Sequence, residues 1–203
     1  MDVLSIIEEA GWTIWVLIAS SVVSLAIIFE RFWALRKSAT TPRNLTETFE
    51  QAVADGQTDS LKNQIDSCLG RILLTLVNSK SQSKEDLEED IQNIERAELA
   101  YLERFLTTLG SIAAMAPLMG LLGTVIGMIE IFASQSPSGS DPQMLARGIS
   151  VALYNTAMGL VVAIPSMLFY RHFRAKVEAI LMDIEVSASH FAYVLSKHRN
   201  TKK

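Results

Sequence analysis

The sequence contains little of what several common protein classes need. Its 203 residues include one cysteine, Cys68, with only five prolines and ten glycines, which excludes a disulfide-stabilised scaffold and a long disordered linker. The formal net charge is -4, which disfavours nucleic-acid binding. Charge is also absent from three long runs, residues 10–29, 105–129 and 148–170, which contain no Lys, Arg, Asp or Glu.

These three runs are 20, 25 and 23 residues long and predominantly apolar. An α-helix rises about 1.5 Å per residue, so each run can cross a hydrocarbon core of roughly 30 Å. The sequence therefore predicts an all-α protein with transmembrane helices at residues 10–33, 105–133 and 148–170. The connecting parts are predicted as an outer N-terminus (1–9), a cytoplasmic helical segment (34–104), an outer loop (134–147) and a cytoplasmic C-terminal helix (171–203).

The distribution of basic residues predicts the orientation. Ten Lys and Arg residues lie between the first and second charge-free runs, seven follow the third run, and only Arg147 lies between the second and third. Since basic residues stay on the cytoplasmic side, the N-terminus and the 134–147 loop are expected to face outward. The first nine residues contain no Lys or Arg, so we interpret the first span as a retained helix rather than a signal peptide.

Apolar residues at helical spacing continue beyond the spans. From Leu87 the pattern runs into the second span with no Pro or Gly before Gly110, which predicts one continuous helix over residues 85–131. A second pattern over residues 177–195 predicts a buried helix face after the third span. Glu30 and Arg31 end the first span, and we interpret them as its cytoplasmic boundary.

Small residues follow one face of the second span and one face of the third. Small side chains let helices approach closely, and hydroxyl or amide groups among them can hydrogen-bond across helices or line a polar conduit. Composition leaves both interpretations open, a packing seam or a wet, partner-filled interior. The two faces comprise Ala113, Ala116, Gly120, Gly123, Thr124 and Gly127, and Ala152, Asn155, Thr156, Gly159, Ala163 and Ser166.

Two sequence blocks in these spans resemble the ExbB/TolQ/MotA proton-channel family, and ExbB most closely. They read Ala116-Pro-Leu-Met-Gly-Leu-Leu-Gly-Thr-Val-Ile-Gly-Met and Gly148-Ile-Ser-Val-Ala-Leu-Tyr-Asn-Thr-Ala-Met-Gly-Leu-Val-Val-Ala-Ile-Pro. The Glu30-Arg31-Phe-Trp sequence is also ExbB-like. The resemblance implies a homopentamer around a central pore in the bacterial inner membrane. It also implies a single-span ExbD- or TolR-like partner inside the pore and a TonB- or TolA-like protein driven by the proton-motive force.

The resemblance also implies roles for individual residues. Thr124 and Thr156 match the two pore threonines of the family, whose hydroxyls would hand on protons or orient water. The alternative is that each hydroxyl bonds to the carbonyl four residues earlier in its own helix. Where many relatives have Glu, this chain has Val151, so the carboxylate that is protonated is expected to be the partner's aspartate. The remaining residues expected to line the pore are Gly120, Gly127, Ala152, Asn155, Gly159 and Ala163.

Glu130 is the acidic residue of the second span. It is a candidate for proton uptake from the outer side, or an ordinary interfacial charge, because it lies one turn from the outer loop. The sequence contains no nucleophile–base motif and no phosphate-binding loop, and its three histidines are not spaced as metal ligands. We therefore expect no enzyme activity, no cofactor and no metal.

The three predicted spans and the family resemblance together predict an ExbB-like subunit of a membrane motor. With an ExbD-like partner it would energise a TonB-like protein for outer-membrane transport, in contact with membrane lipid and without a nucleic-acid partner. Two alternatives stay open: a TolQ-like role in the Tol envelope system, and a passive membrane scaffold through which no proton moves.

Overall fold

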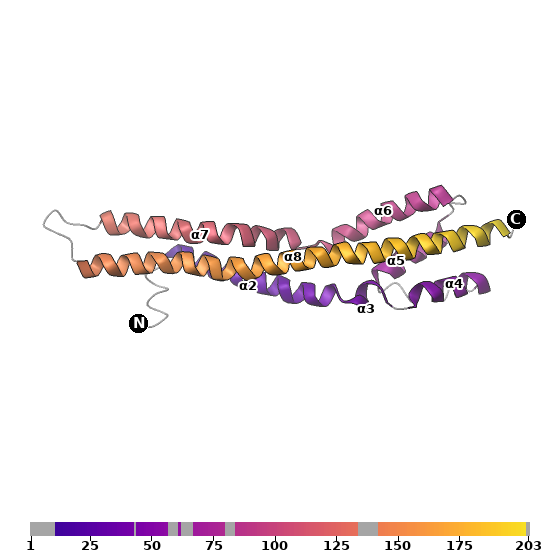
Figure 1. The fold of residues 1–203 in the computed structure, drawn as a ribbon, viewed down its shortest axis with the longest axis horizontal. Helices are drawn as coiled ribbons and strands as arrows, with labels where there is room; N and C mark the ends of the chain where they lie inside the picture. The colour runs from indigo at the N-terminus through magenta and orange to yellow at the C-terminus, as the bar shows by residue number, and fades with distance from the viewer. Residues whose placement is uncertain are drawn as a thin grey trace. The chain divides into compact units, whose positions relative to one another are not determined.

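A computed structural model of the protein describes residues 11–42, 44–56, 61, 67–79, 84–133 and 142–201. In this part of the chain the regular structure is helical, which confirms the all-α prediction. The predicted outer N-terminus (1–9) and residues 134–141 of the predicted loop lie outside the described residues. The main helices are α2 (Trp12–Ala34), α3 (Lys37–Thr40), α4 (Leu45–Asp55), α5 (Cys68–Asn78), α6 (Lys84–Leu102), α7 (Leu106–Ala133) and α8 (Pro142–Thr201), as Figure 1 shows.

Three of the described helices, α2, α7 and α8, are long and apolar enough to cross a membrane. This agrees with the three spans expected from the sequence. Helix α8 begins at Pro142, before the predicted start of the third span at Gly148, and continues through Pro165 to Thr201. The third span and the C-terminal helix are therefore one helix.

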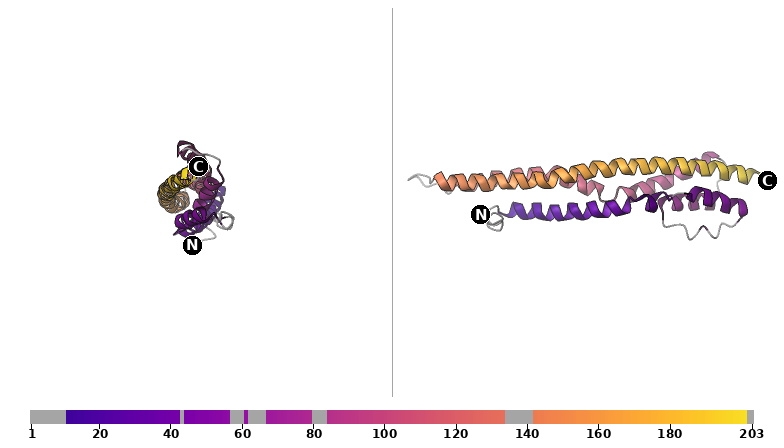
Figure 2. Two further views of the ribbon diagram at one scale, coloured as in Figure 1. Left: turned by 90° about the vertical axis from the view of Figure 1, so that its right-hand side faces the viewer. Right: turned by 60° about the horizontal axis from the view of Figure 1, so that its bottom comes forward.

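The chain divides into two compact units. Unit 1 comprises Met1–Glu30 and Phe105–His172, and unit 2 comprises Arg31–Arg104 and Phe173–Lys203. Helices α2 and α8 contribute residues to both units. In unit 1, α7 lies beside the N-terminal part of α8, as Figure 1 and the right-hand view of Figure 2 show.

Small residues pack the helices of unit 1 together. Leu17 of α2 joins Ala116 of α7 and Ala163 of α8 in one buried apolar cluster. Two serines link α2 to α8, with 2.6 Å between Ser24 Oγ and Ser166 Oγ. Because Ser166 gives its hydroxyl proton to the Val162 carbonyl, Ser24 is the donor of this bond.

Large side chains form the core of unit 2. Phe49, Phe173 and Phe191 are fully buried, together with leucines of α5 such as Leu73. The rings of Phe49 and Phe191 meet edge to face, with 6.0 Å between their centroids. This geometry suits the quadrupoles of two aromatic rings, so α4 is joined to α8 by specific packing as well as by apolar burial.

The prediction of one helix over residues 85–131 is wrong. Helix α6 ends at Leu102 and a turn precedes α7, with Phe105 at φ 62°. The left-handed region costs a residue with a side chain about 1–2 kcal/mol. The buried Arg31 donates from Nη1 to the Leu102 carbonyl at 3.0 Å, so the end of α6 is satisfied by a side chain distant in sequence. No local sequence pattern reports such a contact, which explains the missed break.

Candidate functional site

Helices α7 and α8 approach each other closely at Gly120 and Gly159. A Cβ on Gly120 would lie 2.7 Å from the Asn155 carbonyl oxygen, and one on Gly159 would lie 2.6 Å from the Ala116 carbonyl oxygen. Both obstacles are backbone atoms, which cannot turn away as a side chain can. Each glycine is therefore required for the distance between the two helices.

Most of the residues expected to line a pore lie inside this contact. Gly120 of α7 is buried, and so are Ala152, Asn155, Gly159 and Ala163 of α8. Gly127 is half-buried, and a Cβ there would lie 3.5 Å from the Ala152 Cβ, an ordinary distance. One protomer already covers these residues, as the packing-seam interpretation describes, and their lining of a pore stays a prediction.

The two threonines lie at the margin of the contact. Thr124 and Thr156 are both half-buried. Thr124 Oγ1 donates to the Leu121 carbonyl at 2.6 Å, a bond within its own helix but to the carbonyl three residues earlier, not to the expected one four residues earlier. Its oxygen keeps lone pairs that accept hydrogen bonds, so this bond leaves Thr124 an acceptor. The Thr156 Cα is 3.0 Å from the position of a Cβ on Gly120, at the edge of the tightest approach.

A small cavity with a mixed polar and apolar lining lies at the end of unit 1 where α2 begins and α7 ends. Its volume is about 40 Å³, and its lining residues include Thr13, Glu130 and Asn155. Thr13 and Asn155 are only 3% and 2% exposed, whereas Glu130 is exposed. Gly123 and Val151 also line the cavity. The structure thus brings the predicted residues Glu130 and Asn155 together with Thr13, a residue that the sequence analysis did not select.

The sequence patterns did not indicate which residues α2 contributes to this region, because only the faces of small residues on the second and third spans were selected as candidates. Its buried polar side chains, Thr13, Ser24 and Arg31, share one helix face with Leu17 and Ile28. The steps between these positions are four, seven, four and three residues, which is helical spacing. Polar residues on an apolar face within a membrane span are the signal that would have found them.

The predicted boundary residues differ in their surroundings. Glu30 is exposed, whereas Arg31 is only 1% exposed and donates to the Leu102 carbonyl at 3.0 Å and to the Tyr101 carbonyl at 3.5 Å. A guanidinium at the carbonyl end of a helix complements the helix dipole. Arg31 therefore supports the end of α6, and the position of both residues at the cytoplasmic boundary stays a prediction.

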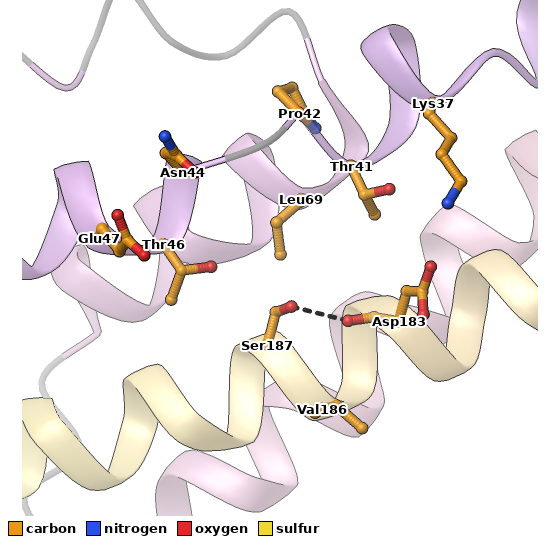
Figure 3. Close-up of a pocket in the computed structure, with 10 residues that line it drawn as sticks. All are labelled: Lys37, Thr41, Pro42, Asn44, Thr46, Glu47, Leu69, Asp183, Val186 and Ser187. Atoms are coloured by element: carbon orange, nitrogen blue, oxygen red, sulfur yellow. Dashed lines mark hydrogen bonds between the residues drawn. The ribbon is translucent and has the colours of Figure 1, made fainter.

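A larger groove of about 700 Å³ lies in unit 2, between α3, α4, α5 and α8 (Figure 3). Its charged lining residues are Lys37, Glu47 and Asp183. The Ser187 hydroxyl on its floor donates to the backbone carbonyl of Asp183 at 2.8 Å. The described residues contain no group of three or more His, Cys, Asp or Glu side chains that could hold a metal. The groove thus shows a mixed polar wall without a catalytic arrangement.

In unit 2, titratable side chains of α5 and α6 are joined by hydrogen bonds. Arg71 donates to Glu98 from Nε at 2.7 Å and from Nη2 at 2.5 Å, and the Cys68 thiol donates to the same carboxylate at 3.1 Å. Burial, with Glu98 as hydrogen-bond partner, raises the pKa of the Cys68 thiol. A buried thiol that stays protonated is a poor nucleophile.

Comparison with known proteins agrees with this architecture. The profile of the MotA/TolQ/ExbB proton channel family matches residues 38–186. The chain is 32% identical over 167 residues to the putative biopolymer transport protein ExbB-like 3 of Synechocystis sp., covering 78% of this chain and 79% of that protein. It is 30% identical over 201 residues to the Tol-Pal system protein TolQ of Haemophilus influenzae, covering 90% and 86%. The chain is a membrane protein that belongs to the MotA/TolQ/ExbB proton channel family, close to ExbB.

Proposed function

We propose that the chain is an ExbB-like subunit of an inner-membrane motor driven by the proton-motive force. Together with a single-span, ExbD-like partner, it energises a TonB-like protein for transport across the outer membrane. Its N-terminus faces the periplasm and its C-terminus the cytoplasm. Family membership, the three apolar helices and the distribution of basic residues support this proposal.

The observation that carries the proposal is the position of the two threonines. Five copies surround a pore, and the seam between α7 and α8 forms its wall. Thr124 and Thr156 lie half-buried at the margin of that seam, so a neighbouring copy or a partner helix can reach them. The buried glycines hold the two helices at a fixed distance and so position both hydroxyls.

The membrane spans contain few charges that could carry a proton. Within the described residues of unit 1, the acidic side chains are Glu30 and Glu130 and the basic ones are Arg147 and Arg171, with His172 beside Arg171. The middle of each span is uncharged, so the moving carboxylate belongs to the partner. Its protonation from the outer side removes a charge and lets the partner helix shift. One charge moved through 100 mV supplies about 2.3 kcal/mol for this movement.

The test is the replacement of Thr156 by Val, which removes the hydroxyl at nearly constant volume. We expect Thr156→Val to abolish energy-dependent uptake in cells and proton flux in liposomes, while the assembly keeps its mass in detergent. Thr156→Ser restores both activities because it restores the hydroxyl. Thr108→Val is the matched control, because Thr108 is exposed and lies near the start of α7. Normal uptake by Thr156→Val would remove Thr156 from the proton path.

Two other functions have specific support. A TolQ-like role is favoured by the similarity to TolQ of Haemophilus influenzae, and complementation of strains that lack ExbB or TolQ separates the two clients. A passive scaffold is favoured by the Thr124 bond to its own helix. Replacing the partner's aspartate with asparagine decides this case, because a scaffold gives the same flux with either partner.

A further inference from the structure

We propose that Glu130, Thr13 and Asn155 form a hydrated proton-binding site in the small cavity of unit 1. The proposal deepens the function proposed above and rests on it, since it names the place where a proton is taken up before it reaches the partner. This chain has Val151 where the family resemblance leads us to expect a carboxylate. Glu130 on α7 would supply an acidic group beside that position of α8. Glu130 of α7 lines the same cavity as Val151 of α8.

The cavity has the size and lining that a bound water requires. Its volume of about 40 Å³ exceeds the minimum of roughly 10–15 Å³ for one water. A buried water needs about two to four polar partners, and Thr13, Glu130 and Asn155 supply a hydroxyl, a carboxylate and an amide. Glu130 is exposed while the other two are buried, so Glu130 is the member of this group that solvent can reach.

Gly123 makes this convergence of three helices possible. A Cβ at Gly123 would lie 2.8 Å from Thr13 Oγ1 and 2.8 Å from Asn155 Nδ2. The polar ends of an α2 and an α8 side chain thus occupy the space that any larger residue on α7 would fill. The packing of α2 and α8 against Gly123 therefore places Thr13 and Asn155 beside each other in the wall of the cavity.

Few other charged groups of the described part of unit 1 lie near the site. Among these residues, Glu30 lies near the C-terminal end of α2, and Arg171 and His172 lie where the unit 1 part of α8 ends. Arg147 lies one turn before Val151 on α8, and the titratable Tyr154 precedes Asn155 on that helix. Within the described residues, Glu130 is thus the acidic group of this end of unit 1. Hard metal ions are held by about six oxygen atoms, more than these three side chains provide.

The proton transfer is a simple exchange. A hydronium ion gives its proton to a Glu130 carboxylate oxygen, which leaves a neutral carboxyl group and a water molecule. The carboxyl then donates a hydrogen bond to the cavity water, which Thr13 and Asn155 orient. In the reverse step the proton returns to a water, and the carboxylate forms again.

The test measures this protonation directly on the full chain, assembled in lipid nanodiscs. Infrared difference spectra between acidic and neutral buffer should contain a carboxyl C=O band that disappears in Glu130→Gln. The band should shift to higher frequency in Thr13→Val and in Gly123→Ala, because the water that hydrogen-bonds to the carboxyl is lost. Thr13→Ser should restore its position. Ser20→Ala is the matched control, since that α2 hydroxyl donates to the Val16 carbonyl at 2.8 Å, and it should leave the band unchanged.

Proton flux in liposomes separates failure of the site from failure of the proposed function. We expect Glu130→Gln to lower flux roughly tenfold or more, because an amide cannot take up and release the proton that the carboxylate transfers. If the wild-type assembly conducts no protons but the band behaves as described, the motor function fails and the site stands. If Thr156→Val abolishes flux while no Glu130 band appears, or the band ignores Thr13→Val, the site is overturned. A band that follows sodium concentration instead of pH also overturns it.

Discussion

The two units use the same helix, α8, in opposite ways. In unit 1 its contacts depend on the smallest residues, such as Gly159 against the backbone of α7. In unit 2 they depend on the largest apolar ones, with Phe173 and Phe191 fully buried. Between helices surrounded by lipid there is little hydrophobic driving force, so stability comes from close approach. Unit 2, whose α6 is rich in charged residues, gains stability by removing large apolar surfaces from water.

Polar contacts differ between the units in the same way. Unit 1 joins α2 to α8 through two neutral hydroxyls, Ser24 and Ser166. Unit 2 uses guanidinium groups at helix ends, because Arg31 donates to α6 and Arg199 donates to the Ser79 carbonyl after α5 at 2.9 Å. Burial lowers the pKa of Arg199. Charge thus supports the fold in unit 2, whereas the contacts in the core of unit 1 are neutral.

The largest effect is expected from adding one methyl group to the seam of unit 1. In Gly159→Ala the new Cβ would lie 2.6 Å from the Ala116 carbonyl oxygen and 3.2 Å from the Gly120 Cα, so α7 and α8 must separate. We expect a loss of about 3 kcal/mol or more, at the upper end of overpacking effects. Unfolding in mixed micelles with increasing SDS measures this loss.

Gly127→Ala is the matched control on the facing helix. Its Cβ would meet the Ala152 Cβ at 3.5 Å, an ordinary contact, so its unfolding should stay within about 0.5 kcal/mol of wild type. If the two variants were equally stable, the seam would tolerate an added methyl group, and close approach of the helices would not be what stabilises unit 1.

A smaller effect is expected from removing the guanidinium at the end of α6. Arg31→Met keeps much of the side-chain length but leaves the Leu102 carbonyl without its donor. We expect a loss of about 1–3 kcal/mol, the cost of an unsatisfied buried polar group. Amide hydrogen exchange should show the last turn of α6 opening before the rest of unit 2.

Arg36 provides the comparison for this prediction. Its guanidinium lies over the exposed Trp33 ring, with 5.2 Å from Cζ to the ring centroid. Such an exposed contact is worth roughly 0.5–1 kcal/mol, so Arg36→Met should change stability less than Arg31→Met. An Arg31 variant with normal exchange in α6 would show that water replaces the guanidinium.

The sequence predicted the parts of this fold that depend on local pattern. Charge-free runs of sufficient length identified the helices α2, α7 and α8 as spans, and family blocks identified the two threonines. It did not predict the break after Leu102, because Arg31, distant in sequence, satisfies that end of α6. Periodicity describes a helix face but not the donor that terminates a helix.

The candidate site shows the same limit. The stripes of small residues were predicted, yet composition did not decide between a seam and a conduit. That decision needed the distances at Gly120 and Gly159, which depend on how α7 and α8 are paired. Thr13 belongs to the site only because α2 packs against Gly123 of α7. Contacts among three helices are not encoded in the pattern of any one of them.

The smallest effect concerns two carboxylates one turn apart on α6, and it tests whether charge stabilises unit 2. Burial alone would raise the pKa of Glu98, but hydrogen bonds from Arg71 and Cys68 outweigh it and hold this pKa below its ordinary value of 4.5. Burial, with the charge of Glu185, instead raises the pKa of Glu95. The two groups therefore contribute to stability with opposite dependence on pH.

For Glu98, the folded form binds fewer protons than the unfolded form below pH 4.5, so its contribution is complete above that pH and is lost as the pH falls through its lowered pKa. For Glu95, the contribution is complete below pH 4.5 and is lost as the pH rises through its raised pKa.

At neutral pH, Glu98→Gln should therefore cost about 1–2 kcal/mol, while Glu95→Gln should leave stability unchanged or raise it. Denaturant unfolding at neutral pH and near pH 4 measures both, and the two variants should approach each other in acid. Equal losses at neutral pH would mean that the Arg71 pair contributes nothing beyond the helix, and that the fold of unit 2 depends on its apolar core alone.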